Sequence, residues 1–307
     1  MTRLQLSEVS LCAVDTRAPE LAAQSLHQSM AGVDFGRVVL FTRDGVAESL
    51  RSDIEVVVID PITSGADYSR FVMRHLLDHI HGSHVLITQW DGFVTHPGAW
   101  NPAFLECDYI GAVWPEQPEG MNVGNGGFSL RSRRFLQAGR DARIVQEHPE
   151  DEVLCRQHRS LLEQKHGIRF APTALARQFA FENETAAAPT FGFHGPYNLP
   201  RVLDEPTLLA WLPQLPDVFF RSRDARRLAR AMLAHRMPAA ATELLRRRRA
   251  AGRRDNNTRA LGWLASAQAL VTARPTPKPK PDPDPDPNPD PDSEPKPKPK
   301  PEPEPKP

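Results

Sequence analysis

The chain has 307 residues, of which 40% are hydrophobic, and its 38 basic and 38 acidic side chains cancel to a formal net charge of zero at pH 7. This length suits one domain of about 200 residues with a small appendage. We expect no membrane span, because no apolar stretch approaches 18 residues, and no signal peptide, because the N-terminal part has only the run SLCAV before polar residues. Three cysteines without metal-ligand spacing fit a reducing compartment, so we expect a cytoplasmic protein.

The first part of the chain predicts alternating strands and helices. Strands are expected at residues 10–17, 38–43, 55–60 and 85–87, and helices at residues 19–30 and 68–80. Such alternation is typical of a mainly parallel, Rossmann-like sheet with helices on both faces. We therefore predict an α/β fold for this part.

A polar turn follows the apolar strand at residues 85–87 and contains Gln89, Trp90 and Asp91. Open α/β sheets bind ligands at the carboxyl ends of their strands, and a carboxylate at that edge suits a metal ion and its bound diphosphate. Asp-Gly is also a common turn dipeptide, so a purely local role for Asp91 stays open.

A glycine-rich loop at residues 124–132 contains Asn125, Gly126 and Gly127. Glycine allows a positive φ and a close approach of the backbone to a ligand, but the spacing matches neither a phosphate loop nor a dinucleotide-binding loop. A turn between two strands would use the same glycines, so both interpretations stay open. Aromatic side chains near these motifs are candidates for stacking on a sugar ring or for core packing: Trp90, Trp114 and Phe128.

An acidic cluster, Glu150-Asp151-Glu152, begins a predicted helix after Pro149. Acids in a first turn interact favourably with the helix dipole, which is one explanation of the cluster. The other explanation is that a carboxylate takes a proton from an attacking sugar hydroxyl. On this second interpretation Asp151 is the first candidate for the base and Glu150 is the second.

A late loop at residues 191–198 combines aromatic residues, glycines and a proline around His194. Such a loop can fold over a nucleotide and present the imidazole to a metal ion or a diphosphate. A surface histidine without a function would look the same in the sequence.

Several of these motifs together resemble a known family. The fragments LITQWDGFV, CDYIGAVWP, VGNGGFSLRS, PEDEVLC and FGFHG look like domain of unknown function 5672, and the similarity spans about residues 11–199. That family is regarded as glycosyltransferase-like, with an A-type fold. The resemblance implies a nucleotide-sugar donor for this chain.

The order of the motifs is similar to that in metal-dependent galactosyltransferases, which carry a DxD turn, an acceptor loop, an acidic pair and a late histidine. This resemblance implies that Asp91 and His194 hold a divalent cation, Mn²⁺ or Mg²⁺, and that Asp151 or Glu150 activates the acceptor. Gln89 stands where a DxD motif has its first carboxylate, so metal dependence is left open.

The resemblance also implies which residues contact the two substrates. Donor contacts are implied for Val14, Asp15, Thr16, Gln89, Trp90 and Asp91. Acceptor contacts are implied for Trp114, Asn125, Gly126, Gly127 and Phe128.

The second part of the chain divides by composition. Residues 221–274 hold 14 arginines against 3 acids, and 16 of the 31 prolines lie from Pro275 onward. We predict a glycosyltransferase-like domain at residues 1–216, a basic segment of three helices at 217–274, and a disordered tail at 275–307. The arginines form a solvated face or contact anionic lipid headgroups, and no nucleic-acid partner is expected.

Two hypotheses of different class follow. The first is a glycosyltransferase that moves a sugar from a nucleotide-sugar donor to a glycan or lipid-linked acceptor. The second is a catalytically inactive sugar- or nucleotide-binding module whose proline-rich tail recruits partners. The single carboxylate in the turn around Gln89 keeps the second hypothesis open.

Overall fold

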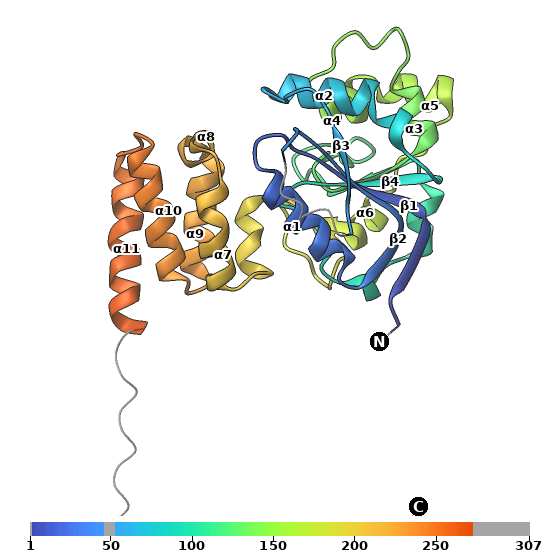
Figure 1. Cartoon of the computed structure of the whole chain (residues 1–307). Coiled ribbons are helices and arrows are strands. Elements are labelled where there is room, and N and C mark those ends of the chain that lie inside the picture. The colour runs from blue at the N-terminus through green and yellow to red at the C-terminus, as the bar shows by residue number, and fades with distance from the viewer. Residues whose placement is uncertain (1, 46–52, 273–307) are drawn as a thin grey trace, which may run out of the picture. The chain divides into compact units, whose positions relative to one another are not determined.

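A six-stranded sheet lies at the centre of the computed structural model, which describes residues 2–45 and 53–272 (Figure 1). Its strands lie in the order β3-β2-β1-β4-β6-β5. β1 to β4 run parallel, and β6 is antiparallel to both β4 and β5. The predicted α/β fold with a mainly parallel sheet is confirmed. The strand bounds are Leu4–Val14 (β1), Val33–Thr42 (β2), Glu55–Val58 (β3), His84–Thr88 (β4), Tyr109–Gly111 (β5) and Ser129–Ser132 (β6).

Helices cover both faces of the sheet because alternate side chains of a strand point in opposite directions. In β1, Leu11 and Ala13 join the apolar cluster that contains residues of α1 (Pro19–Met30). Cys12 and Val14 join a second cluster that contains residues of α2 (Gly65–Arg74). The unbroken apolar run of β1 therefore reflects burial on both faces, as is usual for parallel strands.

The helix predicted at residues 68–80 consists of two elements. α2 begins at Gly65 because Ser64 and Asp67 form a capping box, in which each side chain accepts the backbone N–H of the other residue. A 3-10 helix (Leu76–His79) follows α2. The predicted start was late because the side-chain cap, rather than the apolar periodicity, determines where this helix begins.

Short elements connect β4 to the helical end of the chain. The strands β7 and β8 pair in parallel, with Phe181 opposite Phe193. This pairing brings the residues that follow them, Glu182 and His194, side by side. The bounds are α3 (Arg133–Ala138), α4 (Glu150–Glu152), a π-helix (Val153–Gln157), α5 (Arg159–His166), α6 (Thr173–Phe179), β7 (Ala180–Phe181), β8 (Gly192–Phe193), and 3-10 helices at Pro97–Ala99, Pro102–Glu106 and Pro196–Arg201.

A series of helices forms the last part of the described chain. The three helices predicted in the basic segment correspond to α9, α10 and α11, which lie side by side in Figure 1. They share an apolar cluster with Phe93 and Phe193. The boundary at residue 216 stays a prediction, and the tail at 275–307 lies outside the described residues. The bounds are α7 (Glu205–Trp211), a 3-10 helix (Leu212–Gln214), α8 (Asp217–Arg221), α9 (Arg223–Ala234), α10 (Pro238–Ala250) and α11 (Asn256–Thr272).

One arginine of the basic run is internal. Arg248 is 4% exposed, and its guanidinium donates to the carbonyls of Phe220 and Ser222 and to the Thr258 hydroxyl. The prediction of a solvated arginine face is wrong at this position, because Arg248 satisfies carbonyls at the end of α8. Of the helices in the described ranges, none has the length and apolar content to cross a membrane.

Candidate active site

The turn after β4 places three predicted donor residues, Gln89, Trp90 and Asp91, at the carboxyl edge of the sheet. The Gly92 N–H donates to the Gln89 carbonyl at 3.0 Å, which closes the turn. Position 92 requires glycine because a Cβ there would lie 2.8 Å from the Phe193 carbonyl oxygen. Asp91 is 7% exposed, and its Oδ1 atom has no hydrogen-bond partner among the described residues. A buried carboxylate oxygen that accepts no hydrogen bond favours a nearby cation or a proton.

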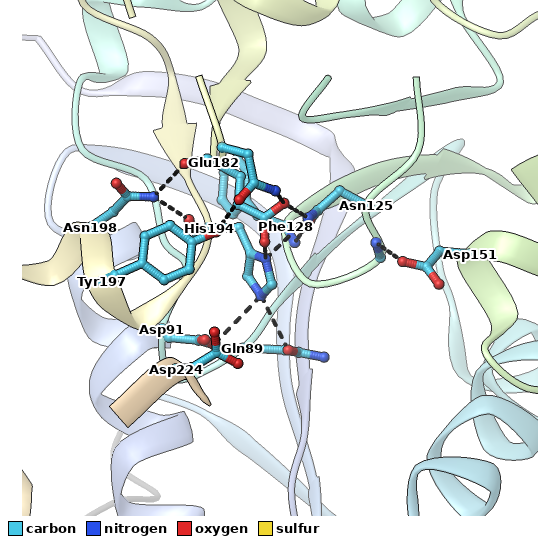
Figure 2. Close-up of polar contacts among 12 residues, drawn as sticks. Gln89, Asp91, Asn125, Phe128, Asp151, Glu182, His194, Tyr197, Asn198 and Asp224 are labelled. Atoms are coloured by element: carbon cyan, nitrogen blue, oxygen red, sulfur yellow. Dashed lines mark hydrogen bonds and ion pairs between the residues drawn. The ribbon is translucent and has the colours of Figure 1, made fainter. Parts of the chain in front are cut away.

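His194 lies against this carboxylate (Figure 2). Its Nε2 atom is 3.6 Å from Asp91 Oδ1 and 3.3 Å from Gln89 Oε1, and its Nδ1 atom is 3.2 Å from Glu182 Oε1. Burial alone would lower the pKa of His194, but the carboxylates of Asp91 and Glu182 outweigh burial and raise this pKa to about 10. In the protein alone His194 is therefore an imidazolium between two carboxylates at neutral pH.

Glu182 is a site residue that no sequence pattern indicated. It accepts a hydrogen bond from Asn125 Nδ2 at 2.7 Å, and the Asn198 amide donates to the carbonyls of Glu182 and His194 at 2.9 and 2.8 Å. Burial would raise the pKa of Glu182, but its hydrogen bond to His194 keeps this pKa below the ordinary value. Glu182 follows a short strand directly, but this position identifies it as a site residue only once the pairing of β7 with β8 is known.

The glycine-rich loop lays its backbone against His194 and against the acidic cluster. A Cβ on Gly127 would lie 2.0 Å from His194 Nε2, and a Cβ on Gly126 would lie 2.4 Å from Glu150 Oε1. Asn125, with a φ of 64°, turns the chain into this position. The two glycines are thus required by contacts inside the site, which a plain turn between strands would not explain.

Gly127→Ala is expected to displace His194 from Asp91. The added Cβ overlaps the imidazole ring, and overpacking of this kind lowers the free energy of unfolding by about 1–3 kcal/mol. Gly98→Ala is the matched control, because a Cβ at position 98 meets no described atom within 4 Å. Urea unfolding measures the difference, and equal stability of the two variants would contradict the packing of the loop against His194.

The two acids of the predicted catalytic pair point in different directions. Glu150 is 4% exposed and forms an ion pair of 2.7 Å with Arg131, whose side chain is fully buried. Burial raises the pKa of Glu150 in spite of this partner. Asp151 faces the glycine loop and accepts the Gly126 N–H at 3.1 Å. We therefore withdraw Glu150 as a candidate base, because its carboxylate is the counter-ion of Arg131, and keep Asp151.

Two cavities adjoin along this edge and share Gly65, Tyr68 and Gln89. The β1 cavity has a volume of about 200 Å³, and among its wall residues are Val14, Asp15 and Trp90. The loop cavity has a volume of about 390 Å³. Most of the predicted donor and acceptor residues therefore lie in one place. The site residues that line the loop cavity are Trp114, Asn125, Gly126, Gly127, Glu150, Asp151, Glu182 and His194.

A family match covers the part of the chain that carries this site. Residues 52–194 match a protein family described as protein of unknown function (DUF5672). The match spans 143 of the 307 residues, a little under half of the chain. The matched residues include Asp91, the glycine-rich loop, Asp151 and His194. No curated protein matches the chain in sequence.

Two solved structures are similar to this chain at a low level. Both are glucosyl-3-phosphoglycerate synthase from Mycobacterium tuberculosis in complex with Mn²⁺ and uridine diphosphate, one with glucosyl-3-phosphoglycerate and the other with phosphoglyceric acid. Each is 13% identical to this chain, with a TM-score of 0.27. The first similarity covers 42% of this chain and 58% of the synthase, and the second covers 52% and 78%.

Two of the predicted contact residues have structural roles instead. Phe128 is fully buried, and its ring packs against Phe179 and Phe191. Thr16 is 7% exposed, and its hydroxyl accepts the N–H of Ile62 at 2.8 Å. We withdraw the acceptor contact of Phe128 and the donor contact of Thr16, because the first side chain belongs to the core and the second holds a neighbouring loop.

The donor atoms around Asp91 fit a divalent cation that has other ligands besides the protein. Asp91 Oδ1 and Gln89 Oε1 both lie within 3.6 Å of His194 Nε2, and Oδ1 is the buried oxygen described above. Within the described ranges no group of three or more His, Cys, Asp or Glu side chains is arranged to hold a metal ion. A carboxylate, an imidazole and an amide are groups that bind divalent cations in proteins, so a cation here would need further ligands from outside the chain.

Removal of divalent cations should make the stability of the chain depend on pH through His194. Its folded pKa of about 10 lies above the ordinary value of 6.5, so its protonation stabilises the folded state fully below pH 6.5. This stabilisation is lost as the pH rises through 10. In EDTA we expect the free energy of unfolding to fall between pH 7 and pH 10, and to fall less in His194→Gln. Equal pH slopes for the two proteins would contradict an imidazolium at this position.

Proposed function

We propose that this protein transfers a sugar from a nucleotide-sugar donor to a hydroxyl group of an acceptor. The observation that supports this most is that the β1 cavity and the loop cavity adjoin at Gln89, with Asp91 and His194 next to that wall. Sugar transfer needs a nucleotide pocket, a place for the leaving diphosphate and a base near the acceptor, held in fixed positions.

The β1 cavity suits the nucleotide. It lies at the carboxyl ends of β1 and β4, where open α/β sheets bind nucleotides. In its wall, Asp15 accepts the N–H groups of Arg17 and Ala18 at 2.7 and 2.8 Å, and burial raises the pKa of Asp15. Trp90 adds an aromatic surface to the same wall. Val14, Asp15 and Trp90 are therefore the donor contacts that we propose here.

Asp91, His194 and Gln89 would hold a divalent cation, Mn²⁺ or Mg²⁺. When bound, the cation neutralises negative charge on the leaving diphosphate. Glu182 faces Nδ1 of the imidazole, which directs Nε2 toward Asp91. A carboxylate behind a histidine in this way orients the ring before any ligand arrives.

We assign Asp151 as the general base. Its Oδ2 atom accepts the Gly126 N–H at 3.1 Å and its Oδ1 atom accepts the Glu152 N–H at 2.9 Å, which fixes the carboxylate in the wall of the loop cavity. Asp151 takes the proton of the acceptor hydroxyl as that oxygen bonds to the anomeric carbon. The bond from this carbon to the phosphate oxygen breaks, and its electron pair leaves with the diphosphate.

The loop cavity suits the acceptor. Trp114 lines it beside Asn125, Gly126 and Gly127, and these residues offer an aromatic edge together with backbone groups. A glycan or a lipid-linked glycan fits such a surface. Contact of the arginine-rich helices with anionic lipid would serve a lipid-linked acceptor at the cytoplasmic face of a membrane, and we include this contact in the proposal.

Thermal unfolding with nucleoside diphosphates tests the binding part of the proposal. The panel contains the diphosphates of uridine, guanosine, cytidine and adenosine, each with MnCl₂, MgCl₂ or EDTA. A ligand at 100 times its Kd that binds only the folded state adds about 2.7 kcal/mol to the free energy of unfolding. We expect one nucleotide to do so with a divalent cation, and Asp91→Asn to abolish the effect. Asp60→Asn is the control, because Asp60 follows β3 and is exposed.

Turnover of the nucleotide-sugar that carries this nucleotide tests the catalytic part. Release of the free diphosphate, accelerated by sugar acceptors, is the expected result, and no thermal shift with any nucleotide would overturn the proposal. Nucleotide binding without turnover would favour the inactive binding module. The observation that favours this second candidate is the His194 imidazolium, which already lies between Asp91 and Glu182.

A further inference from the structure

Two residues of the helical part of the chain touch the candidate site. The Phe219 ring of α8 meets the Trp90 ring edge-on, with the ring centroids 5.3 Å apart and an interplanar angle of 88°. The Arg227 guanidinium of α9 lies 3.3 Å from the centroid of the Tyr197 ring. Both residues lie outside the family match, which ends at residue 194. The site therefore has neighbours that the family match does not include.

Arg227 begins a line of contacts that leads to His194. Arg227 Nη2 and the Tyr197 hydroxyl both donate to Asn183 Oδ1 at 2.9 Å. The Asn183 amide donates to Glu182 Oε2 at 3.0 Å, and Glu182 Oε1 lies 3.2 Å from His194 Nδ1. The line from α9 to the imidazole is therefore continuous.

Tyr197 and Asn183 support the two strand ends that carry the site. Gly195, with a φ of 96°, passes next to the Tyr197 ring, and a Cβ at this glycine would lie 2.9 Å from Tyr197 Cζ. Figure 2 shows Tyr197 beside Asn198 and Glu182. The planar guanidinium of Arg227 stacks on the Tyr197 ring and donates to the same Asn183 oxygen as the Tyr197 hydroxyl does. It therefore restrains both Tyr197 and Asn183. The Arg227 side chain is 35% exposed, so this restraint comes from its geometry more than from burial.

Phe219 contacts a wall residue of the β1 cavity. Trp90 lines the β1 cavity, and both Trp90 and Phe219 pack against the apolar cluster of the helical part. An edge-to-face aromatic pair is more favourable than the burial of its surface alone. Phe219 therefore favours one orientation of the Trp90 ring.

We propose that α8 and α9 are parts of the active site, with Arg227 as a positioning residue for the Glu182–His194 pair and Phe219 as a positioning residue for Trp90. The catalytic meaning of this positioning rests on the proposed function, but the positioning itself does not. The helical part then completes the site instead of being an appendage to it.

Amide hydrogen exchange across residues 182–198 tests the contact of Arg227. In Arg227→Met the guanidinium is lost while an apolar stem remains, so we expect exchange across 182–198 to rise several-fold, with β1 and β4 unchanged. Arg230→Met is the matched control, because Arg230 lies on the same helix and is exposed. Arg227→Lys keeps the charge without the planar fork and should resemble Arg227→Met. If the Met variant does not fold, the Lys variant decides the test.

Ligand affinity separates positioning from a general loss of stability. Titration with Mn²⁺ alone should show about tenfold weaker binding in Arg227→Met. This is the lower end of the loss in metal affinity that follows when residues supporting a metal-binding histidine are changed. Phe219→Ala should weaken the nucleotide found by thermal unfolding about tenfold. Its control is Val218→Ala, since Val218 is 55% exposed on the same helix. A merely structural role would lower the melting temperature and leave both affinities unchanged.

The outcomes of these experiments are distinct from those that test the proposed function. Wild-type exchange across 182–198 in Arg227→Met, or in the Lys variant, would overturn the positioning role of Arg227. Unchanged nucleotide affinity in Phe219→Ala would overturn the positioning role of Phe219. If the wild-type chain binds neither Mn²⁺ nor any nucleoside diphosphate, the proposed function fails, and the exchange data still decide whether α9 positions the Glu182–His194 pair.

Discussion

Asp151→Asn should lower the turnover of the nucleotide-sugar by about 100- to 10,000-fold, the usual contribution of a positioned general base. Asparagine keeps an oxygen that accepts the Gly126 N–H, so the glycine loop should keep its shape. It cannot take a proton from an acceptor hydroxyl at neutral pH. We therefore expect kcat to fall while the nucleotide affinity stays close to that of the wild type.

The matched control for this variant is Glu152→Gln. Glu152 follows Asp151 directly, and its carboxylate pairs at 2.6 Å with Arg156, whose side chain is 36% exposed. Steady-state kinetics with the donor found by thermal unfolding measure both variants. A wild-type kcat in Asp151→Asn would remove Asp151 as the base, and a joint loss of nucleotide affinity and kcat would instead assign its carboxylate to the structure of the glycine loop.

Glu150→Ala should lower the free energy of unfolding by about 3–5 kcal/mol, because it leaves the charge of Arg131 buried and unpaired. Arg131 is fully buried, and its other hydrogen bonds go to the neutral Ser129 hydroxyl and Gly126 carbonyl. Its Nη1 atom has no hydrogen-bond partner in the described part of the chain. Neutral acceptors do not compensate a buried cation, so the loss should exceed that at any surface pair.

Two comparisons make this prediction specific. Glu184→Ala removes the partner of Arg177, whose side chain is 56% exposed, and should lower the free energy of unfolding by about 1 kcal/mol or less. The double variant Arg131→Met with Glu150→Met removes both charges and should be more stable than Glu150→Ala. Urea unfolding measures all three variants. Equal losses of free energy of unfolding in Glu150→Ala and Glu184→Ala would show that burial does not make the Arg131–Glu150 pair more important for stability than a surface pair.

The local sequence pattern was sufficient to predict those strands and turns that depend on residues close together in the chain. The apolar runs of β1 and β4 predicted strands, and both are rich in apolar residues because parallel strands are buried on both faces. The turn after β4 then placed Asp91 at the carboxyl edge. The glycines at 126 and 127 were visible as a motif, although the atoms that require them, on Glu150 and His194, were not.

The roles of neighbouring residues depended on side-chain directions that the pattern does not contain. Successive side chains at a helix start point about 100° apart. Glu150 therefore turns inward to Arg131 while Asp151 turns to the glycine loop. For the same kind of reason Phe128, next to the loop, faces the core instead of a cavity.

The sequence by itself determined the α/β class, the strand end that carries Asp91, and the types of chemical group available to the site. Only the tertiary structure decided which of those groups meet. Glu182 faces His194 because β7 pairs with β8 in one register, and Arg227 reaches Asn183 because α9 packs near that pair. Contacts between residues far apart in the chain depend on strand register and helix packing, and neither is encoded in the local spacing of residues.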